Sequence, residues 1–386
     1  MEEKKIHKRI HHYYKRNEIE KEYKFWDTQL VQKFREKSSI ELGPIKKEFQ
    51  SENIKKEPYE LPPDMAWVEI DIKKEKELDR IYEFLNINYY EIEEYKEMYN
   101  KEFLRWQFTP IKNNKYRNIL LSIQQNNKII GFFSGLPMKL SVYGEELMAY
   151  NISFLCIDKK YRNKNLATIM FKEMFRRTYV EKIYQNIFVS KRLIPKPFSE
   201  SIYYYKILAD MEKEDIKIDN KIKFRPMEKK DINCKSVTKF ISQKQKEFKI
   251  HSIFNEDEIE HWFIPIKNVI YSFVKEDDNN NITDLISFYK IDAIFDDEEE
   301  NWCYIYFNFA TTMTSLELLK HSIILAKENG MDAFICNNIM DYEDSCRKLN
   351  FHCNYEDSNS YGSLKYYFNN FICPETEGKD LSLILI

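Results

Sequence analysis

Glycine is scarce in this chain of 386 residues, which contains seven of them. Turns that need a left-handed backbone conformation must therefore use asparagine or aspartate. The seven cysteines are an odd number and form no CxxC pair, which argues against a disulfide framework and a structural zinc site. No apolar run approaches the roughly 20 residues of a membrane span, and the N-terminus lacks a signal-peptide core. We therefore expect reduced cysteines, no metal, no membrane span and a cytoplasmic protein.

An excess of charge of one sign is also missing, because 60 lysine and arginine residues face 63 aspartate and glutamate residues. This balance gives no reason to expect a nucleic-acid-binding protein. Hydrophobic residues make up 43% of the chain and aromatic residues 15%. The chain can therefore bury a sizeable core, either as two or three domains or as one core built from two similar halves.

The N-terminal part divides into two segments of different character. Residues 1–22 are basic and contain histidines without a cysteine or carboxylate set, so we expect a flexible arm rather than a metal site. The segment Tyr23–Gln29 holds three aromatic residues without a helical or strand period, which favours ligand binding or the filling of a groove. Prolines between Pro44 and Pro63 predict that residues 23–65 form an extended strap.

Residues 66–215 and 216–386 show the same order of predicted elements: a strand, helices, an antiparallel meander and a long helix. In the first half we expect helices over 75–89, 101–108 and 166–179 and strands over 67–72, 118–124, 128–136, 139–143 and 151–157. In the second half we expect helices over 230–244, 259–263 and 315–329 and strands over 223–227, 269–275, 284–289 and 304–309. The repeat predicts a duplicated α/β fold of the acetyltransferase-like (GNAT) type, with two pseudo-symmetric halves around a saddle-shaped mixed sheet.

A basic loop leads into the long helix predicted over 166–179. Backbone N–H groups at a helix start, together with Arg162 and Lys164, form a suitable site for a pyrophosphate. Because the loop has no glycine, Asn163 and Asn165 must supply its turn geometry. A basic helix start without a ligand remains the alternative.

Short segments along the chain resemble, in the same order, those of the eukaryotic N-myristoyltransferase family. These segments are Tyr23–Gln29, Pro58–Pro62, Leu193–Pro197, Phe224–Met227, Lys230–Ile232, His261–Phe263 with Pro265, Thr283–Tyr289 and Leu383–Ile386. The resemblance runs from Tyr23 to Ile386. It implies a duplicated acetyltransferase-like fold and transfer of myristate from myristoyl-CoA, as co-substrate, to an N-terminal glycine. The expected partners are myristoyl-CoA and proteins or peptides with that glycine, and we expect a monomer without a prosthetic group.

The resemblance also implies which residues bind acyl-CoA and carry the chemistry. The residues matched to acyl-CoA are Tyr23, Lys24, Phe25, Trp26, Phe154, Leu155, Cys156, Ile157, Arg162, Asn163, Lys164, Asn165, Leu166 and Ala167. Backbone N–H groups of Phe154 and Leu155 match the oxyanion hole, which stabilises the charge that develops in acyl transfer. The α-carboxylate of Ile386, at the end of an apolar tail expected to be a buried strand, matches the base that deprotonates the glycine ammonium. Cys156 lacks an evident His and Asn or Asp partner set, so it is not expected to act as a nucleophile.

The peptide side matches the family less closely. The residues implied there are Glu91, Glu93, Glu94, Ser153, Ser190, Tyr203, Tyr205, Tyr289 and Asn308. The three glutamates would attract a basic substrate residue, with a solvated acidic turn as the alternative, and Tyr289 could equally belong to the core. Ser153, Lys191, Arg192 and Tyr205 differ from the family residues. Two alternatives therefore stay open: acyl transfer with another scope, to lysine side chains or with another chain length, and a non-catalytic acyl-CoA or peptide binder.

Overall fold

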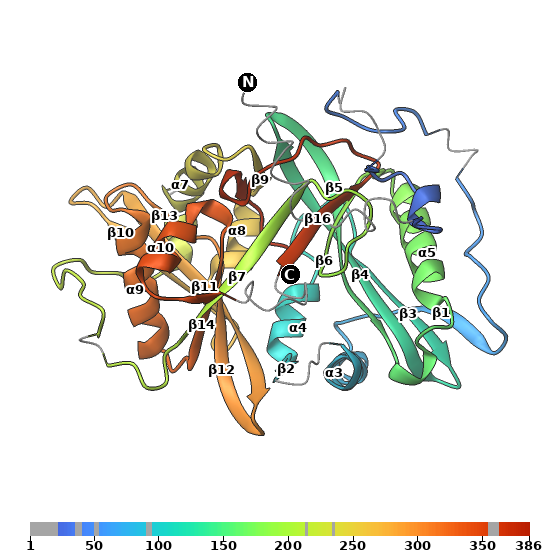
Figure 1. Cartoon of the computed structure of the whole chain (residues 1–386), viewed down its shortest axis with the longest axis horizontal. Helices are drawn as coiled ribbons and strands as arrows, with labels where there is room; N and C mark the ends of the chain where they lie inside the picture. Colours follow the sequence, from blue (N-terminus) through green and yellow to red (C-terminus); the bar gives the residue numbers. More distant parts are fainter. Residues whose placement is uncertain are drawn as a thin grey trace.

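The computed structural model describes residues 22–34, 41–49, 54–89, 95–212, 215–233, 236–353 and 363–386. Within these ranges the strands join in one connected mixed sheet, with helices packed on its faces (Figure 1). The predicted α/β class is confirmed. No helix in the described ranges has the length and the apolar character that crossing a membrane requires.

The N-terminal half follows a short 3-10 helix of the strap, η1 (Trp26–Thr28). Its strands are β1 (Met65–Glu69), β2 (Tyr95–Met98), β3 (Ile119–Gln125), β4 (Lys128–Val142), β5 (Glu145–Ile157), β6 (Asn186–Ser190) and β7 (Ser199–Ile207). Its helices are α3 (Glu75–Asn88), α4 (Lys101–Phe108), η3 (Lys159–Tyr161) and α5 (Leu166–Val180).

The C-terminal half repeats this arrangement. Its strands are β8 (Arg225–Pro226), β9 (Ile250–Ile253), β10 (Ile270–Glu276), β11 (Ile282–Phe295), β12 (Glu298–Ile305), β13 (Phe309–Ala310), β14 (Ala333–Asn337), β15 (His352–Cys353), β16 (Ser363–Asn369) and β17 (Leu381–Ser382). Its helices are α6 (Lys229–Asn233), α7 (Ser236–Gln245), α8 (Glu256–Phe263), α9 (Ser315–Glu328), η5 (Ile339–Asp341), α10 (Glu343–Lys348) and η6 (Gly378–Asp380).

The pairing of the strands shows that the two halves are copies of one unit. In the first half, the meander β3–β4–β5 is followed by α5 and then by β6, which lies parallel to β5. In the second half, the meander β10–β11–β12 is followed by α9 and then by β14, which lies parallel to β12. The first strand of each unit is antiparallel to the first meander strand, β1 to β3 and β8 to β10. The duplication predicted from the sequence is therefore confirmed, while the boundaries at residues 22, 65 and 215 stay predictions.

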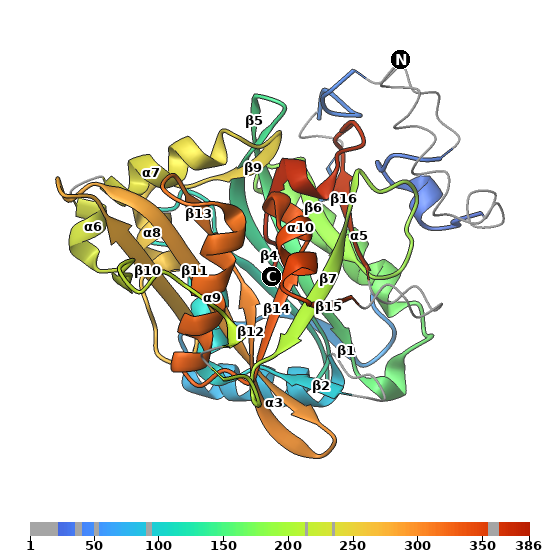
Figure 2. The ribbon, with the colours of Figure 1, turned by 60° about the vertical axis from the view of Figure 1, so that its left-hand side comes forward.

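The two units exchange strands where they meet. Strand β2, between α3 and α4, pairs with β11 of the other unit, and β9, between α7 and α8, pairs with β4. Strand β7 pairs with β14, β16 pairs with β6, and β7 and β16 pair with each other. Figures 1 and 2 show that these crossed strands bring the C-terminus to the middle of the molecule. The end of the chain therefore lies where both halves meet.

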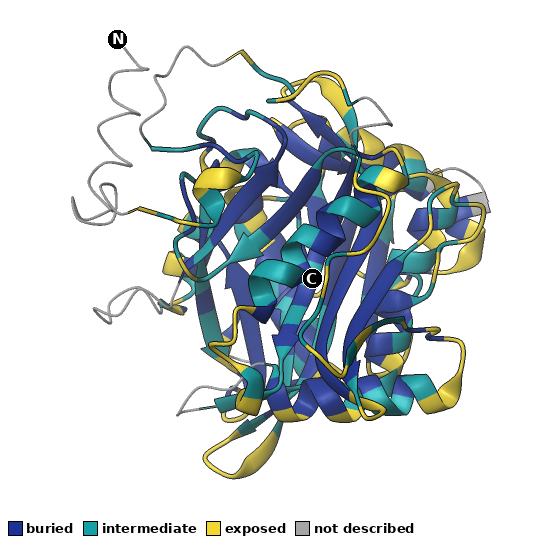
Figure 3. Ribbon diagram, turned by 90° about the vertical axis from the view of Figure 1, so that its right-hand side faces the viewer, coloured by how far each residue is buried: buried dark blue, intermediate teal, exposed yellow. Residues whose placement is uncertain are grey.

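The strands are largely buried, and the exposed residues concentrate in loops and on outer helix faces (Figure 3). One apolar cluster extends through both halves, and a second lies under α5. The strap is fixed on α5 by the fully buried Glu173, which accepts from the N–H of Tyr59 (2.9 Å) and pairs with Arg176 and Arg177 (2.7 and 2.8 Å). Burial alone would raise the pKa of Glu173, but these partners hold that pKa below its ordinary value.

The two strands predicted over 128–136 and 139–143 are one strand, β4, which continues through Pro137. Strand β3 pairs with β4 up to Gly135, and β9 pairs with it from Lys139 on. Pro137 therefore occupies the gap between the two neighbours on that edge, where its missing N–H breaks no ladder hydrogen bond.

Several predicted strands differ in length from the structure, such as the strand predicted over 284–289, which is β11 over 282–295. Two further predictions differ in the position or the number of elements. The strand predicted over 304–309 is wrong in its position, because β12 begins at Glu298 and ends at Ile305. The helix predicted over 230–244 corresponds to two helices, α6 and α7, and residues 234–235 between them lie outside the described ranges.

Candidate active site

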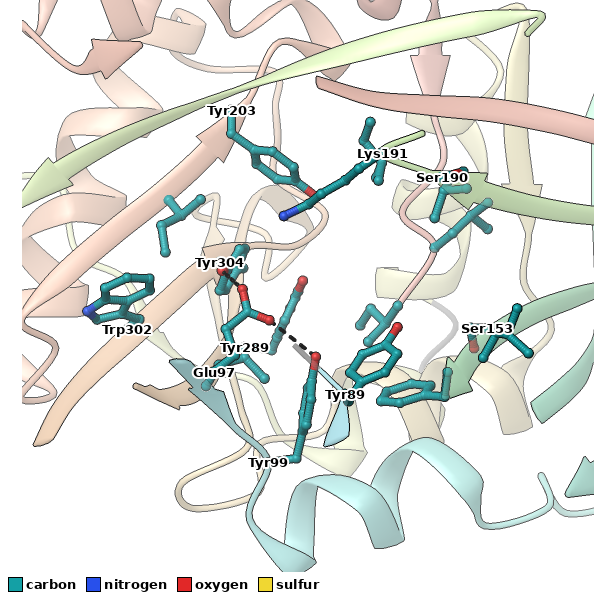
Figure 4. Close-up of a pocket in the computed structure, with 18 of the residues that line it drawn as sticks. Tyr89, Glu97, Tyr99, Ser153, Ser190, Lys191, Tyr203, Tyr289, Trp302 and Tyr304 are labelled. Atoms are coloured by element: carbon teal, nitrogen blue, oxygen red, sulfur yellow. Dashed lines mark hydrogen bonds between the residues drawn. The ribbon is translucent and has the colours of Figure 1, made fainter. Parts of the chain in front are cut away.

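A cavity of about 520 Å³ lies where the two halves meet (Figure 4). Its lining residues come from the segment 89–207 of the first half and from 289–386 of the second. Most of them are aromatic or aliphatic, with a few hydroxyl groups and charged groups among them. A concave, mainly apolar site with a few convergent polar groups is the usual form of a site for an amphipathic ligand.

The C-terminal residue Ile386 reaches this cavity. Its carbonyl oxygen accepts hydrogen bonds from Nε2 of Gln107 (3.1 Å) on α4 and from Nδ2 of Asn151 (3.5 Å) on β5. Both donors are less than 8% exposed, so buried side chains hold this oxygen of the partly buried Ile386. The buried strand predicted over Leu381–Ile386 is correct only for its first two residues, which pair with β9. The rest of the tail is largely buried without strand pairing.

A β-bulge interrupts β5 beside the cavity. Two residues, Phe154 and Leu155, face the single residue Phe133 of β4. Phe154 has φ of +54°, a left-handed conformation that phenylalanine rarely adopts. Its buried ring stacks on the ring of Tyr89 and meets the ring of Tyr99 edge to face, with centroid distances of 5.2 and 5.4 Å. This packing holds the conformation of Phe154. A bulge takes a backbone group out of the ladder, which makes that group available to a ligand.

Five of the predicted peptide-side residues line this cavity: Ser153, Ser190, Tyr203, Tyr205 and Tyr289. In Figure 4 the two serines lie at the right of the view, and Tyr203 and Tyr289 lie to their left.

The remaining peptide-side residue that the structure describes, Asn308, does not line the cavity. Asn308 is 3% exposed, accepts from the N–H of Ser287 (2.7 Å) and donates to Oγ of Ser322 (2.9 Å), so the structure gives it a place in the core. Glu91, Glu93 and Glu94 lie outside the described residues.

Three charged lining residues, Glu97, Lys191 and Glu300, were not among the predicted site residues. The carboxylate of Glu97, on β2, accepts hydrogen bonds from the hydroxyls of Tyr304 (2.6 Å) and Tyr99 (3.2 Å), as Figure 4 shows. Burial raises the pKa of both phenols and the nearby Glu97 raises it further, so both stay neutral donors. Lys191, which follows β6, also lines the cavity. Its departure from the family pattern was visible in the sequence, whereas Glu97 showed no signal beyond its place in an acidic stretch.

The aromatic segment predicted to bind acyl-CoA packs beside the same cavity. The ring of Trp26 stacks on Phe188 (5.5 Å) and meets Phe171 edge to face (4.9 Å), and both phenylalanines line the cavity. The ring centroids of Phe25 and Phe171 lie 6.3 Å apart. The side chain of Lys24 is exposed. The N–H of Tyr23 donates to Asp27 (2.8 Å), which closes the segment into a turn.

The loop before α5 has the geometry that the sequence predicted. Asn163 and Asn165 have φ of +64° and +61°, so asparagine supplies the left-handed turn conformations. The first N–H groups of α5 have no intrahelical acceptor and point out of the helix start. Arg162 donates to the backbone oxygens of Asn88 (2.6 Å) and Ile157 (3.3 Å), so it also braces the loop. Lys164 lies over the ring of Tyr161 at 4.5 Å.

The residues next to the bulge and the helix start are apolar or buried. Cys156 is 3% exposed, and burial raises the pKa of its thiol to about 12. A thiol that stays protonated is a poor nucleophile, which agrees with the expectation that Cys156 does not form a covalent intermediate. Leu166 is buried, while Ile157 and Ala167 are partly buried.

Comparison with known proteins identifies the family. The model for the N-terminal domain of myristoyl-CoA:protein N-myristoyltransferase matches residues 44–201, and the model for its C-terminal domain matches residues 198–382. The chain belongs to the N-myristoyltransferase family.

Relatives and solved structures of the N-myristoyltransferase family cover nearly the whole chain. The glycylpeptide N-tetradecanoyltransferase of Plasmodium falciparum is 30% identical over 397 residues, which cover 96% of this chain and 95% of that protein. The enzyme of the same name from Dictyostelium discoideum is 29% identical over 392 residues, with 95% and 93% covered. The structure of Saccharomyces cerevisiae N-myristoyltransferase with bound myristoyl-CoA has a TM-score of 0.82 and 26% identity, and the match covers 93% of this chain and 94% of that chain. The fold predicted from the resemblance is confirmed.

Proposed function

We propose that this chain is a glycylpeptide N-tetradecanoyltransferase, an acyltransferase that moves myristate from myristoyl-CoA to the α-amine of an N-terminal glycine. The observation that carries this proposal is one cavity in which the carboxylate end of Ile386, the bulge at Phe154 and Leu155, and the hydroxyls of Ser153 and Ser190 meet. All these groups belong to one chain, so we also predict an active monomer.

The acceptor amine has to lose a proton before it can react. The pKa of a glycine α-amine is about 8, so most of it is ammonium at neutral pH. We assign the base to the α-carboxylate of Ile386, whose fixed position between Gln107 and Asn151 supports this role. Hydroxyls of Ser153 and Ser190 can accept from the ammonium and orient it. The neutral nitrogen then attacks the thioester carbon, and the C–N bond forms as the C–S bond breaks. One of the two amine protons stays on the amide nitrogen, and CoA leaves as its thiol with the other.

Negative charge develops on the thioester oxygen during this attack. We assign its stabilisation to the backbone N–H groups of Phe154 and Leu155. The bulge supports this role, because its extra residue interrupts the ladder and the buried ring of Phe154 holds the backbone in one conformation. Preorganised donors of this kind contribute about 10²–10³-fold each to acyl transfer.

The acyl-CoA site is proposed along α5. The N–H groups at the start of α5, after the turn formed by Asn163 and Asn165, suit the pyrophosphate of CoA. Trp26 packs against Phe171 and Phe188, which supply an apolar wall of the cavity that suits a fatty-acyl chain.

A direct test is to incubate the protein with myristoyl-CoA and a peptide that begins with glycine, and to map the added acyl mass. We expect the product on the N-terminal amine and none with a peptide that begins with alanine. A peptide with a blocked N-terminus and a lysine side chain tests the altered scope. If acyl-CoA binds but no peptide is acylated, the proposed function is wrong and the chain is a binding protein.

A further inference from the structure

Lys191 is the feature of the cavity that the proposed chemistry does not use. It directly follows Ser190 at the end of β6, and its side chain extends into the cavity beside Tyr203 (Figure 4). Among the lining residues that the structure describes, Lys191 is the one side chain with a positive charge. The cavity therefore has a cationic point next to the proposed site of the acceptor amine.

Hydrogen bonds hold the backbone on both sides of the side chain of Lys191. Lys365 on β16 is 4% exposed, and its Nζ donates to the carbonyl oxygen of Lys191 (3.4 Å) and lies 3.4 Å from the carboxylate of Glu200. On the other side, the N–H of Arg192 donates to Oγ of Ser190 (3.1 Å). A buried ammonium needs such partners, so Lys365 stays in place and the carbonyl of Lys191 stays with it. The fold therefore fixes the direction in which the side chain of Lys191 leaves the backbone.

The cavity lining also carries charge of the other sign. Glu97 and Glu300 line the cavity, and each accepts hydrogen bonds from protein donors: Glu97 from Tyr99 and Tyr304, and Glu300 from the indole of Trp302. In Figure 4 Glu97 and Lys191 enter the cavity from different sides. A ligand carboxylate would be attracted by the charge of Lys191 and repelled by the charges of Glu97 and Glu300.

We propose that Lys191 selects acceptor peptides that carry an aspartate or glutamate within the first few residues after the N-terminal glycine. This inference rests on the proposed function. An ammonium makes short, charge-assisted hydrogen bonds with a carboxylate. An extended peptide advances about 3.3 Å per residue, so the side chains after the glycine pass the residue next to Ser190. A basic side chain at the same place would meet a like charge.

The test is a panel of glycine peptides in which aspartate, asparagine or lysine stands in turn at each of the five positions after the glycine. The measured quantity is the ratio of kcat/KM for aspartate over asparagine at each position. In the wild-type protein we expect a ratio of about ten to a hundred at one position, which is typical for a partly desolvated charge-assisted hydrogen bond. The ratio should fall to about one in Lys191→Gln, and in Lys191→Glu the peptide with lysine at that position should become the best substrate.

The matched control is Arg192→Gln, which removes a neighbouring positive charge that is exposed and does not line the cavity. This variant should keep the wild-type ratio. An equal fall in Arg192→Gln would overturn the inference, because the effect would then be a general one of charge. A wild-type ratio near one at every position would also overturn it, while acylation itself continues. Acylation of none of the peptides would instead refute the proposed function.

Discussion

The role of the chain end can be tested by converting the α-carboxylate of Ile386 to a carboxamide through semisynthesis. The amide keeps a carbonyl oxygen that can accept from Gln107 and Asn151, at 3.1 and 3.5 Å in the unmodified protein. It also keeps the buried packing of the tail, including Leu383 and Leu385. The change therefore removes the base and the negative charge with little change of shape. We expect acyl-CoA binding to be unaffected and acyl transfer to be slow.

The size of the loss follows from the task of the base. General-base catalysis contributes about 10²–10⁴-fold, or about 3–5 kcal/mol. The amidated protein must use the fraction of glycine that is already neutral, which is about one tenth at pH 7 for an amine with pKa near 8. Its transfer rate should therefore rise about tenfold per pH unit up to pH 8 and then level off.

The assay is a single turnover with myristoyl-CoA bound in advance, followed by rapid quenching and quantification of the acylated peptide. A variant with one glycine added after Ile386 serves as a second perturbation, because it moves the carboxylate by one residue, about 3.8 Å between Cα atoms. The assignment of the base is refuted if the amidated protein keeps more than about a tenth of the wild-type single-turnover rate at pH 7.

Three other features of the structure give measurable consequences. Glu173→Gln should lower the free energy of unfolding by about 3 kcal/mol at pH 7, because Arg176 and Arg177 lose a buried partner. Since the folded pKa of Glu173 is lowered, its contribution is complete above an unfolded pKa of about 4.3, so the difference from wild type in urea unfolding should shrink as the pH falls below that value. A constant difference down to pH 3 would contradict this. Trp26→Ala should weaken acyl-CoA binding by about tenfold in calorimetry, and unchanged affinity would remove Trp26 from the acyl-CoA site. At pH 8 Cys156 should resist alkylation in the folded protein, and alkylation as fast as in urea would show that its thiol is accessible and ionised.

The sequence predicts local structure well where the local signals agree. Helix α3 and helix α5 begin at the residues expected and end within one residue of them, because apolar spacing and the polar residues around them point the same way. The left-handed turn at Asn163 and Asn165 was also predictable, since no glycine stood nearby to adopt it.

The strand predicted over 304–309 missed most of β12, which begins at Glu298. Glutamates at 298–300 have low strand propensity, so the preferences of these residues do not indicate a strand there. In the structure Asp296 and Asp297 have φ of +48° and +66°, which is the conformation of a two-residue hairpin turn, and they set the register Phe295 to Glu298. The partner strand and the turn override the propensity of single residues.

Local sequence patterns do not predict how the residues of the site come together. Glu97 faces the cavity because β2 leaves its own unit and pairs with β11 of the other. The sequence of residues 95–98 does not predict this pairing between the two units, and the acidic stretch is equally compatible with a solvated turn. Asn308 shows the opposite case: the family resemblance pointed to the pocket, but its amide completes hydrogen bonds between Ser287 and Ser322 in the core.

The exchange of strands between the units also supports the proposed role of the chain end as the base. A free C-terminus usually frays, and a frayed carboxylate cannot be aimed at a substrate. Here the pairing of β6 with β16 and of β7 with β14 joins the two units across their interface, and the last residues run into that interface behind β17. The proposed base then approaches from the second unit, while the bulge of β5 belongs to the first. Their separation is therefore set by the same paired strands that hold the two halves together, and substitutions that weaken the β6–β16 pairing should lower the transfer rate before they lower acyl-CoA binding.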